Sequence, residues 1–213
     1  MPYVDVQFGI QGDLIPADHG YLLFAAVSGV VPSLHGDDGI GIHPISGPQT
    51  GNRLQALTER SCLTLRLPAE RIKEVLTLAG RALKIGEHTI RVGVPHTRAL
   101  IPHPRLYSRL AVIKGFLEPE PFLDAVKRQL DALEVSALPQ LVEQSEIKDA
   151  NRSRRSGSHS QFLRRTIKIR DKEIVGFAVR VEGLSDEESL SLQEAGIGGR
   201  RRFGCGIFVP VRR

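Results

Sequence analysis

The order of apolar patterns along the chain constrains its fold more than any other feature of the sequence. Residues 3–10 alternate apolar and polar side chains, which predicts a strand with one buried face. Residues 20–31 are apolar on most faces and Pro32 follows them, which predicts a buried helix. The next expected elements are a strand at 40–46, a strand at 61–67, an amphipathic helix at 68–81 and one or two strands within 82–94.

The second half of the chain repeats this order without obvious sequence repetition. Its expected elements are a strand at 106–114, a helix at 119–135, an edge strand within 138–147, a hairpin of strands at 162–169 and 173–181, a helix that Ser185 opens, and a strand at 205–211. Ser185 and Glu188 have the spacing of a capping box. Residues 96–104 contain two prolines and two histidines and indicate a linker. The sequence therefore predicts an α+β chain of two tandem ferredoxin-like domains, at residues 1–97 and 104–213.

Charge is distributed unevenly along the chain. The 213 residues carry a formal net charge of +5 with a pI of about 9.5, which favours a polyanionic partner. Acidic residues dominate 118–146, whereas basic residues dominate 148–170 and 200–213. Cys62 and Cys205 lie in apolar runs and are interpreted as buried thiols in a reducing cytoplasm. Neither a membrane-spanning run nor a signal-peptide pattern is visible, so we expect a cytoplasmic protein with no membrane partner.

Regularly spaced glycines mark the C-terminal segment. Gly196 and Gly198 form one Gly-apolar-Gly unit, and Gly204 and Gly206 form a second. The five residues between the units are Gly199, Arg200, Arg201, Arg202 and Phe203. Glycine admits positive φ and close backbone approach, consecutive N–H groups in such a turn converge on an anion, and arginine binds phosphate. A glycine-rich turn with a solvated basic tip is the simpler interpretation, which the regular spacing disfavours.

This spacing resembles the signature of the CRISPR-associated repeat-RNA endoribonucleases, which belong to the RAMP group of RNA-binding proteins. The segment is most similar to their small cyanobacterial and myxobacterial type. The resemblance covers nearly the whole chain and includes residues 34–46 and 111–115. It implies two tandem ferredoxin-like domains and an enzyme that cuts the repeat of a CRISPR precursor transcript. The implied products are a 5′-hydroxyl and a 2′,3′-cyclic phosphate or 3′-phosphate.

His35 is the leading candidate for a catalytic residue. Cutting RNA without a metal ion requires a base for the 2′-OH proton, an acid for the 5′-oxygen and cations for the phosphorane charge. His35 follows the first expected helix in a glycine-containing loop, where the resemblance places the catalytic histidine of the family. His43 is the alternative histidine or the partner acid, and a half-buried strand histidine is its non-catalytic interpretation. Several family members pair the histidine with a tyrosine or lysine, and Tyr21 and Ser28 on the preceding helix are the candidates here.

A second basic cluster precedes the glycine-rich segment. Its members are Arg152, Arg154, Arg155, Arg164, Arg165 and Lys168. Arg164 and Arg165 fall on opposite faces of their expected strand, so one of them is expected to point to RNA. No lysine occurs in residues 32–60, so the transition-state charge would fall to Arg53, Arg60 or the C-terminal arginines. The two clusters, together with the glycines of the C-terminal segment, are the predicted RNA-binding residues.

The resemblance, together with these candidate residues, implies a metal-independent endoribonuclease with no cofactor, whose partner is CRISPR repeat RNA. The chain has no HxxxH or Cx2C pattern that would indicate a metal site. A non-catalytic RAMP subunit that holds guide RNA is the second interpretation, and a ferredoxin-like module that binds a small anion is the third. Other subunits of a CRISPR effector complex and a second copy of the chain are left open as further partners.

Overall fold

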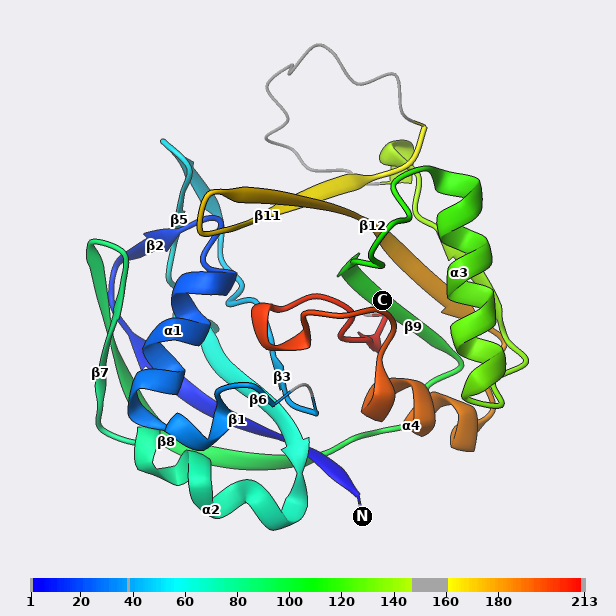
Figure 1. Cartoon of the computed structure of the whole chain (residues 1–213). Helices are drawn as coiled ribbons and strands as arrows, with labels where there is room; N and C mark the ends of the chain where they lie inside the picture. Colours follow the sequence, from blue (N-terminus) through cyan, green and yellow to red (C-terminus); the bar gives the residue numbers. More distant parts are fainter. Residues whose placement is uncertain (1, 38, 147–160, 212–213) are drawn as a thin grey trace. The chain divides into compact units, whose positions relative to one another are not determined.

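The structure, a computed structural model, describes residues 2–37, 39–146 and 161–211. It divides into two compact units (Figure 1). The first comprises Met1–Ile101, Ile167–Glu173 and Arg200–Cys205, and the second comprises Pro102–Thr166, Ile174–Gly199 and Gly206–Arg213. Domain boundaries at residues 97 and 104 stay a prediction.

The main sheet of the first unit has the strand order of a ferredoxin-like fold. Across the sheet its strands are β3 (Gly41–Ile42), β6 (Cys62–Pro68), β1 (Tyr3–Gln11), β8 (His88–Ala99) and β7 (Ala82–Ile85). All neighbouring strands are antiparallel. Strand β1 is central, because Val6 pairs with Leu65 of β6 on one side and with Thr97 of β8 on the other. Apart from the edge strand β7, this is the arrangement that the element order predicts.

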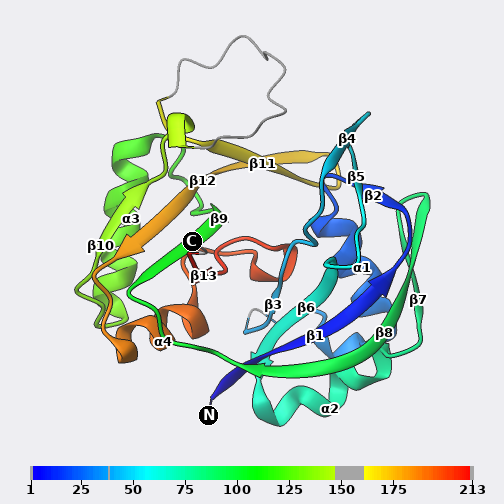
Figure 2. The ribbon, with the colours of Figure 1, turned by 180° about the vertical axis from the view of Figure 1, so that it is seen from behind.

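Two helical segments accompany this sheet (Figure 2). Helix α1 (Gly20–Val30) buries Leu23, Phe24 and Val27, which lie on one face because Val27 is four residues after Leu23 and three after Phe24. The α1 helix ends where Pro32 opens the 3-10 turn η1 (Pro32–Leu34). A helix at this position is therefore confirmed, but it is buried along one face only, since Ala25 and Gly29 are exposed.

The prediction of one continuous amphipathic α-helix at 68–81 is wrong. The segment consists of η2 (Ala69–Arg71), one turn of α-helix, α2 (Ile72–Val75), and η3 (Leu76–Leu78). Val75 and Leu78 are its buried side chains. A 3-10 helix has three residues per turn, so side chains spaced by three residues lie on one face. Val75 and Leu78 can therefore both be buried without a continuous α-helix.

A small sheet occupies residues for which the sequence predicted no strand. Its strands, β2 (Leu14–Pro16), β5 (Leu54–Ala56) and β4 (Gln49–Gly51), lie in this order. Each has three residues. A period of two cannot be recognised over so short a run, and therefore the alternation pattern missed this sheet.

The second unit repeats the ferredoxin-like order. The elements that lie wholly or partly in this unit are β9 (Arg105–Ala111), α3 (Pro119–Ala132), β10 (Leu138–Leu141), β11 (Arg164–Ile169), β12 (Lys172–Glu182), α4 (Asp186–Ala195) and β13 (Val209–Pro210). The sheet order is β10-β12-β9-β13, and β11 pairs with β12. The predicted capping box is present, since the Ser185 hydroxyl accepts from the Glu188 N–H and the Glu188 carboxylate accepts from the Ser185 N–H.

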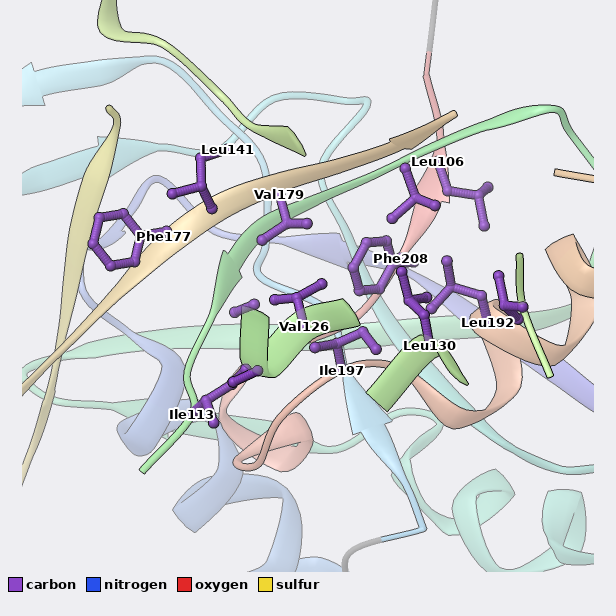
Figure 3. Packing of buried hydrophobic residues seen from close by; sticks show 14 of the residues in the cluster. Leu106, Ile113, Val126, Leu130, Leu141, Phe177, Val179, Leu192, Ile197 and Phe208 are labelled. Carbon is purple, nitrogen blue, oxygen red and sulfur yellow. The ribbon is translucent and has the colours of Figure 1, made fainter. Parts of the chain in front are cut away.

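The core of the second unit lies between α3 and the sheet (Figure 3). Val126 and Leu130 come from the apolar face of α3, and Phe122 on the same face places its ring 4.9 Å from that of Phe177. Ile197 and Phe208, which flank the glycine-rich centre, belong to the same buried cluster. Apolar burial therefore fixes both ends of the glycine-rich segment.

Three predicted boundaries are corrected by the structure. Residues 96–99 belong to β8 and not to a linker, because β1 pairs with them through Gln7–His96 and Val4–Ala99. The strand expected at 40–46 is β3 alone, since Pro44 has no N–H to continue a ladder. The strand expected at 205–211 is reduced to β13, because Gly206, at φ 65°, turns its N–H to the Leu110 carbonyl. None of the described helices has the length and apolar character to cross a membrane.

Candidate nucleic-acid interface and active site

His35 is exposed at the end of the 3-10 turn that follows α1. Its N–H donates to the Pro32 carbonyl at 3.0 Å. Its ring centroid lies 6.1 Å from that of Phe24, at an interplanar angle of 39°. The imidazole therefore rests beside an aromatic ring at the surface, with access to solvent and to a ligand.

The centre of the glycine-rich segment belongs to the same unit as His35. Its turn η5 (Arg201–Phe203) is bounded by Arg200 at φ 69° and Gly204 at φ 85°, both in the left-handed region. A Cβ added to Gly204 would approach the Pro44 ring to 2.8 Å, so the glycine permits close packing here. The left-handed Arg200 is exposed and opens the turn.

The ring of Phe24 joins His35 to this turn. The Phe203 ring meets it edge-on at 5.2 Å, and the Arg202 guanidinium carbon lies 5.4 Å from the Phe24 centroid. Arg202 also lies 5.4 Å from the Phe203 centroid, a cation–π distance in both cases. One aromatic residue thus contacts both an imidazole and a guanidinium, the two group types that metal-free phosphodiester cleavage requires.

His43 lies in a buried polar cluster of the same unit. Its Nε2 is 3.5 Å from Asp5 Oδ1, and Arg66 donates to both oxygens of that carboxylate, at 2.8 and 2.9 Å. Arg201, only 7 % exposed, completes the cluster with its guanidinium carbon 6.0 Å from the Tyr3 ring centroid. The predicted partner acid therefore belongs to the protein interior more than to the surface.

Burial and neighbouring cations control the charge of this cluster. Burial lowers the pKa of His43, and Arg66 and Arg201 lower it further, against the opposing effect of Asp5. Burial also lowers the pKa of Arg201. For Asp5, burial opposes ionisation, but the hydrogen bonds from Arg66 and the proximity of His43 outweigh it and hold the pKa well below its usual range. His43 is consequently a neutral imidazole beside an ion pair at neutral pH.

Ser28 is half-buried on α1, and its hydroxyl donates to the Ala25 carbonyl of its own helix at 3.3 Å. Tyr21 of the same helix places its ring 5.8 Å from that of Phe203. Its hydroxyl accepts from Arg170 Nε at 3.4 Å. The Ser28 hydroxyl thus bonds to the backbone of its own helix, whereas the Tyr21 ring packs against the glycine-rich turn.

The glycines at the ends of the segment are engaged within the second unit. The Gly198 N–H donates to Gln129 Oε1 at 2.7 Å, the Gly199 N–H donates to the Val112 carbonyl at 3.0 Å, and the Gly206 N–H is bonded as described above. Gly196, at φ 69°, follows the end of α4, and its N–H donates to the Leu192 carbonyl. These donors do not converge on a free anion site, and a Cβ at Gly198 would clash with the Val112 carbonyl. Close backbone packing therefore explains Gly198 and Gly206, whereas a Cβ at Gly199 would meet no atom within 4 Å.

The second basic cluster is only partly described. Arg164 is exposed and stacks its guanidinium carbon 5.6 Å from the Phe177 centroid, while Arg165 is half-buried, so the two alternate along β11 as expected. Lys168 is exposed, and its backbone N–H donates to Asp18 Oδ2 at 2.7 Å. Arg152, Arg154 and Arg155 lie outside the described residues.

Sequence reasoning missed the residues that surround the two histidines. Phe24 lies in an apolar run that gives no functional signal. Asp5 and Arg66 are opposite each other in the β1–β6 register, and an opposite-charge pair of this kind is recognisable only once the strand pairing is known. Among residues 2–37, 39–146 and 161–211, no group of three or more His, Cys, Asp or Glu side chains is arranged to hold a metal ion.

Comparison with known proteins gives consistent matches over the full length. A sequence profile described as Cas6 Crispr matches residues 4–213. The chain is 36 % identical over 213 residues to the CRISPR-associated endonuclease Cas6 of Myxococcus xanthus (strain DK1622), covering 100 % of this chain and 84 % of that protein.

Solved structures share the fold at low identity. A structure of a Cas6-related gene product from Pyrococcus furiosus is similar with a TM-score of 0.67 at 13 % identity, covering 99 % of each chain. A protein described as a RAMP protein binding different RNA substrates gives a TM-score of 0.66 at 13 % identity, covering 100 % of each chain. The tandem ferredoxin-like fold is confirmed by these likenesses.

Proposed function

This chain belongs to the Cas6 family of CRISPR-associated proteins, and from that premise we propose that it is an endoribonuclease that cuts CRISPR precursor RNA within the repeat. The Myxococcus xanthus relative, which is named an endonuclease, supports this proposal at 36 % identity. The observation that carries the chemistry is the contact of Phe24 with both His35 and Arg202.

The proposed reaction is an in-line attack of the RNA 2′-OH on the adjacent phosphate. The 2′-oxygen forms a bond to phosphorus, the bond to the 5′-oxygen breaks, and a 2′,3′-cyclic phosphate and a 5′-hydroxyl result. His35 acts as the general acid or base, since imidazole exchanges protons readily near neutral pH. Arg202 stabilises the charge that accumulates on the phosphorane oxygens. The proposed reaction uses no metal ion.

His43 and Ser28 remain alternative candidates for the proton transfer. The neutral state of His43 suits a base, but the residue is 16 % exposed and already contacts Asp5. Ser28 would have to exchange its bond to the Ala25 carbonyl for the substrate. The exposure of its imidazole therefore favours His35.

RNA binding is proposed to involve the exposed cations of both basic clusters. Arg200, Arg164 and Lys168 are exposed and suited to phosphate contact. The buried Arg201 is proposed to support the turn more than to contact RNA. Further CRISPR subunits and a second copy of the chain stay predictions.

Cleavage of a labelled repeat RNA in EDTA tests the proposal, with wild type beside His35→Ala. We expect wild type to cut, and His35→Ala to lose at least about 100-fold in rate, the range associated with a general acid–base group. Its affinity for RNA should stay close to that of wild type. His96→Ala is the matched control, because His96 is also an exposed histidine of the first unit.

Each other outcome has a defined meaning. Equal cutting by wild type and His35→Ala would move the catalytic role to His43 or Ser28. Cutting that EDTA abolishes would contradict the metal-independent mechanism. Tight binding without cutting would favour a subunit that only holds guide RNA.

A further inference from the structure

We propose that Arg71 and Glu74 are positioning residues for His35, and that they hold the loop formed by residues 33–37 and Gly39 in the geometry that cleavage requires. The inference rests on the proposed function, because it assumes that His35 exchanges a proton with the RNA. The two residues lie on the segment η2–α2, which is separate in sequence from the loop.

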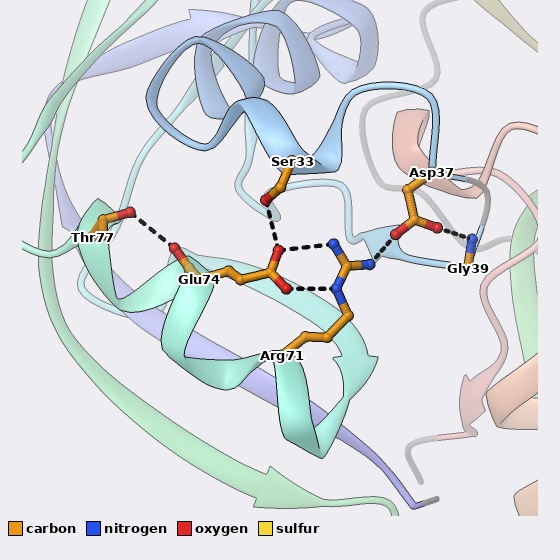
Figure 4. A network of polar contacts seen from close by, with 6 residues as sticks. All are labelled: Ser33, Asp37, Gly39, Arg71, Glu74 and Thr77. Carbon is orange, nitrogen blue, oxygen red and sulfur yellow. Dashed lines mark hydrogen bonds and ion pairs between the residues drawn. The ribbon is translucent and has the colours of Figure 1, made fainter.

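Glu74 binds the loop through Ser33, two residues before His35. The Ser33 hydroxyl donates to Glu74 Oε2 at 2.6 Å (Figure 4). Arg71 donates to the same carboxylate twice, from Nε at 2.9 Å and from Nη2 at 2.8 Å. A bidentate pair of this kind fixes the orientation of both side chains, so Ser33 meets an acceptor of defined position.

Arg71 binds the loop through Asp37, two residues after His35. Its remaining terminal nitrogen, Nη1, pairs with Asp37 Oδ2. The other Asp37 oxygen accepts the Gly39 N–H at 2.7 Å. One guanidinium therefore connects the helical segment to the loop backbone beyond the histidine, as Figure 4 shows.

His35 lies two residues from each of the two bound positions, Ser33 and Asp37. Between His35 and Asp37 lies Gly36 at φ 86°. Because glycine has no Cβ, its backbone can adopt many conformations, so this residue does little to fix the loop. Without the two anchors, this stretch would sample many orientations of the imidazole. Because a misplacement of about 1 Å in a reacting group costs on the order of 100-fold in rate, the anchors bear directly on catalysis.

The charges of Glu74 and Arg71 are constant over the pH range in which an assay would be run. The hydrogen bond from Arg71, then that from Ser33, lowers the pKa of Glu74 to about 2. The same hydrogen bond with Glu74 raises the pKa of Arg71. The pair therefore holds the loop equally at acid and neutral pH, and any pH dependence of the rate belongs to other groups.

A purely stabilising role is the competing explanation. The Arg71 and Glu74 side chains are 21 % and 34 % exposed, and ion pairs at such positions contribute little to global stability. The two explanations thus predict different results, since positioning affects the rate of cleavage and general stabilisation affects the unfolding of the whole chain.

The test compares single-turnover cleavage, RNA affinity and melting temperature for Arg71→Ala and Glu74→Gln. We expect the cleavage rate constant to fall roughly 10- to 100-fold. The Kd for repeat RNA should stay within about twofold and Tm within a few degrees. Arg71→Lys keeps one charge without the fork and should recover only part of the rate. Lys127→Ala, which removes an exposed pair with Asp124 at the same i,i+3 spacing, is the matched control and should leave the rate unchanged.

A measurement without RNA separates this inference from the proposed function. Hydrogen exchange at the amides of His35, Asp37 and Gly39 should accelerate in Arg71→Ala and Glu74→Gln, while the β7–β8 turn at Gly86 should be unaffected. In a His35→Ala background, Arg71→Ala should cause no further loss of rate.

Unchanged exchange in the loop, or faster exchange with an unchanged rate, would overturn the positioning role. A loss of rate that matches the loss of Tm or RNA affinity would also overturn it in favour of general stabilisation. If His35→Ala cuts like wild type, the proposed function of His35 fails and the catalytic part of the inference fails with it. The exchange measurement still decides independently whether the pair holds the loop.

Discussion

At the scale of single residues, the two candidate histidines differ in their surroundings. His35 is exposed against Phe24, whereas His43 is 16 % exposed beside Asp5 and Arg66. Removal from water disfavours a charged imidazole, and the neighbouring guanidinium groups disfavour it further. The same side chain is thus available for proton exchange with a ligand at one position and held neutral at the other.

The buried His43 should make stability depend on pH. Its pKa is lowered in the folded state, while in the unfolded chain it is about 6.5. As pH falls below about 6.5, the unfolded state binds a proton that the folded state does not, so the free energy of unfolding decreases. One such group changes it by at most about 1.4 kcal/mol per pH unit. Urea unfolding between pH 7.5 and 5 measures this slope.

His43→Gln should unfold with a shallower slope over this interval, because it cannot titrate. Most of the interval lies above the pH at which Asp5 and Glu74 begin to take up protons in the unfolded chain, so these carboxylates contribute little to the slope. His88→Gln is a suitable comparison, since His88 is a half-buried histidine of β8 outside the polar cluster. Parallel slopes for wild type and His43→Gln would contradict the prediction.

At the scale of secondary-structure elements, burial decides which helices and strands persist. Helix α3 carries a continuous apolar face into the core of the second unit and runs for 14 residues. The segment after β6 has only Val75 and Leu78 to bury, and it divides into short turns. The packed face, and not the spacing alone, determines the length of each helix.

Leu130→Ala should therefore destabilise the second unit strongly. Leu130 is 1 % exposed on α3, and removing a buried leucine costs about 2–5 kcal/mol through lost burial and the cavity left behind. Leu138→Ala is the control, because this leucine on the edge strand β10 is 70 % exposed. Chemical denaturation of both variants gives the comparison, and similar losses would show that α3 does not carry the core.

At the scale of the whole molecule, the net charge of +5 gives RNA association its electrostatic component. The arginines of the glycine-rich segment do not contribute equally to it. Arg200 is exposed, and Arg202 stacks on two aromatic rings. Arg201 is buried in the polar cluster that contains His43. Neutralising all three together would mix loss of RNA contact with loss of structure.

Arg200→Ala alone should weaken RNA binding and make its salt dependence shallower. If Arg200 contacts one phosphate, the slope of log K against log salt should decrease in magnitude by about 1. Filter binding at several salt concentrations measures it. Lys84→Ala removes one charge from the exposed side of β7, outside both basic clusters, and should leave the slope nearly unchanged. Equal effects of the two variants would indicate that only total charge matters.

The sequence by itself determined the α+β class, the repeated element order, helices α1, α3 and α4, the capping box at Ser185 and the position of His35 directly after α1. These features are encoded within a few consecutive residues, through apolar periodicity, proline and glycine positions, and local hydrogen bonding. The division of residues 68–81 into 3-10 turns and the short strands β2, β4 and β5 were not predictable in this way.

Only the tertiary structure decided how the site is assembled. Phe24 reaches both His35 and Arg202, Arg71 joins Glu74 to Asp37 across 34 residues, and Arg66 meets Asp5 across 61 residues. Such contacts depend on strand register and on which faces pack together, which no local pattern specifies. The sequence places the catalytic candidate on a loop, and the packing of distant segments gives that loop its cation, its aromatic support and its anchors.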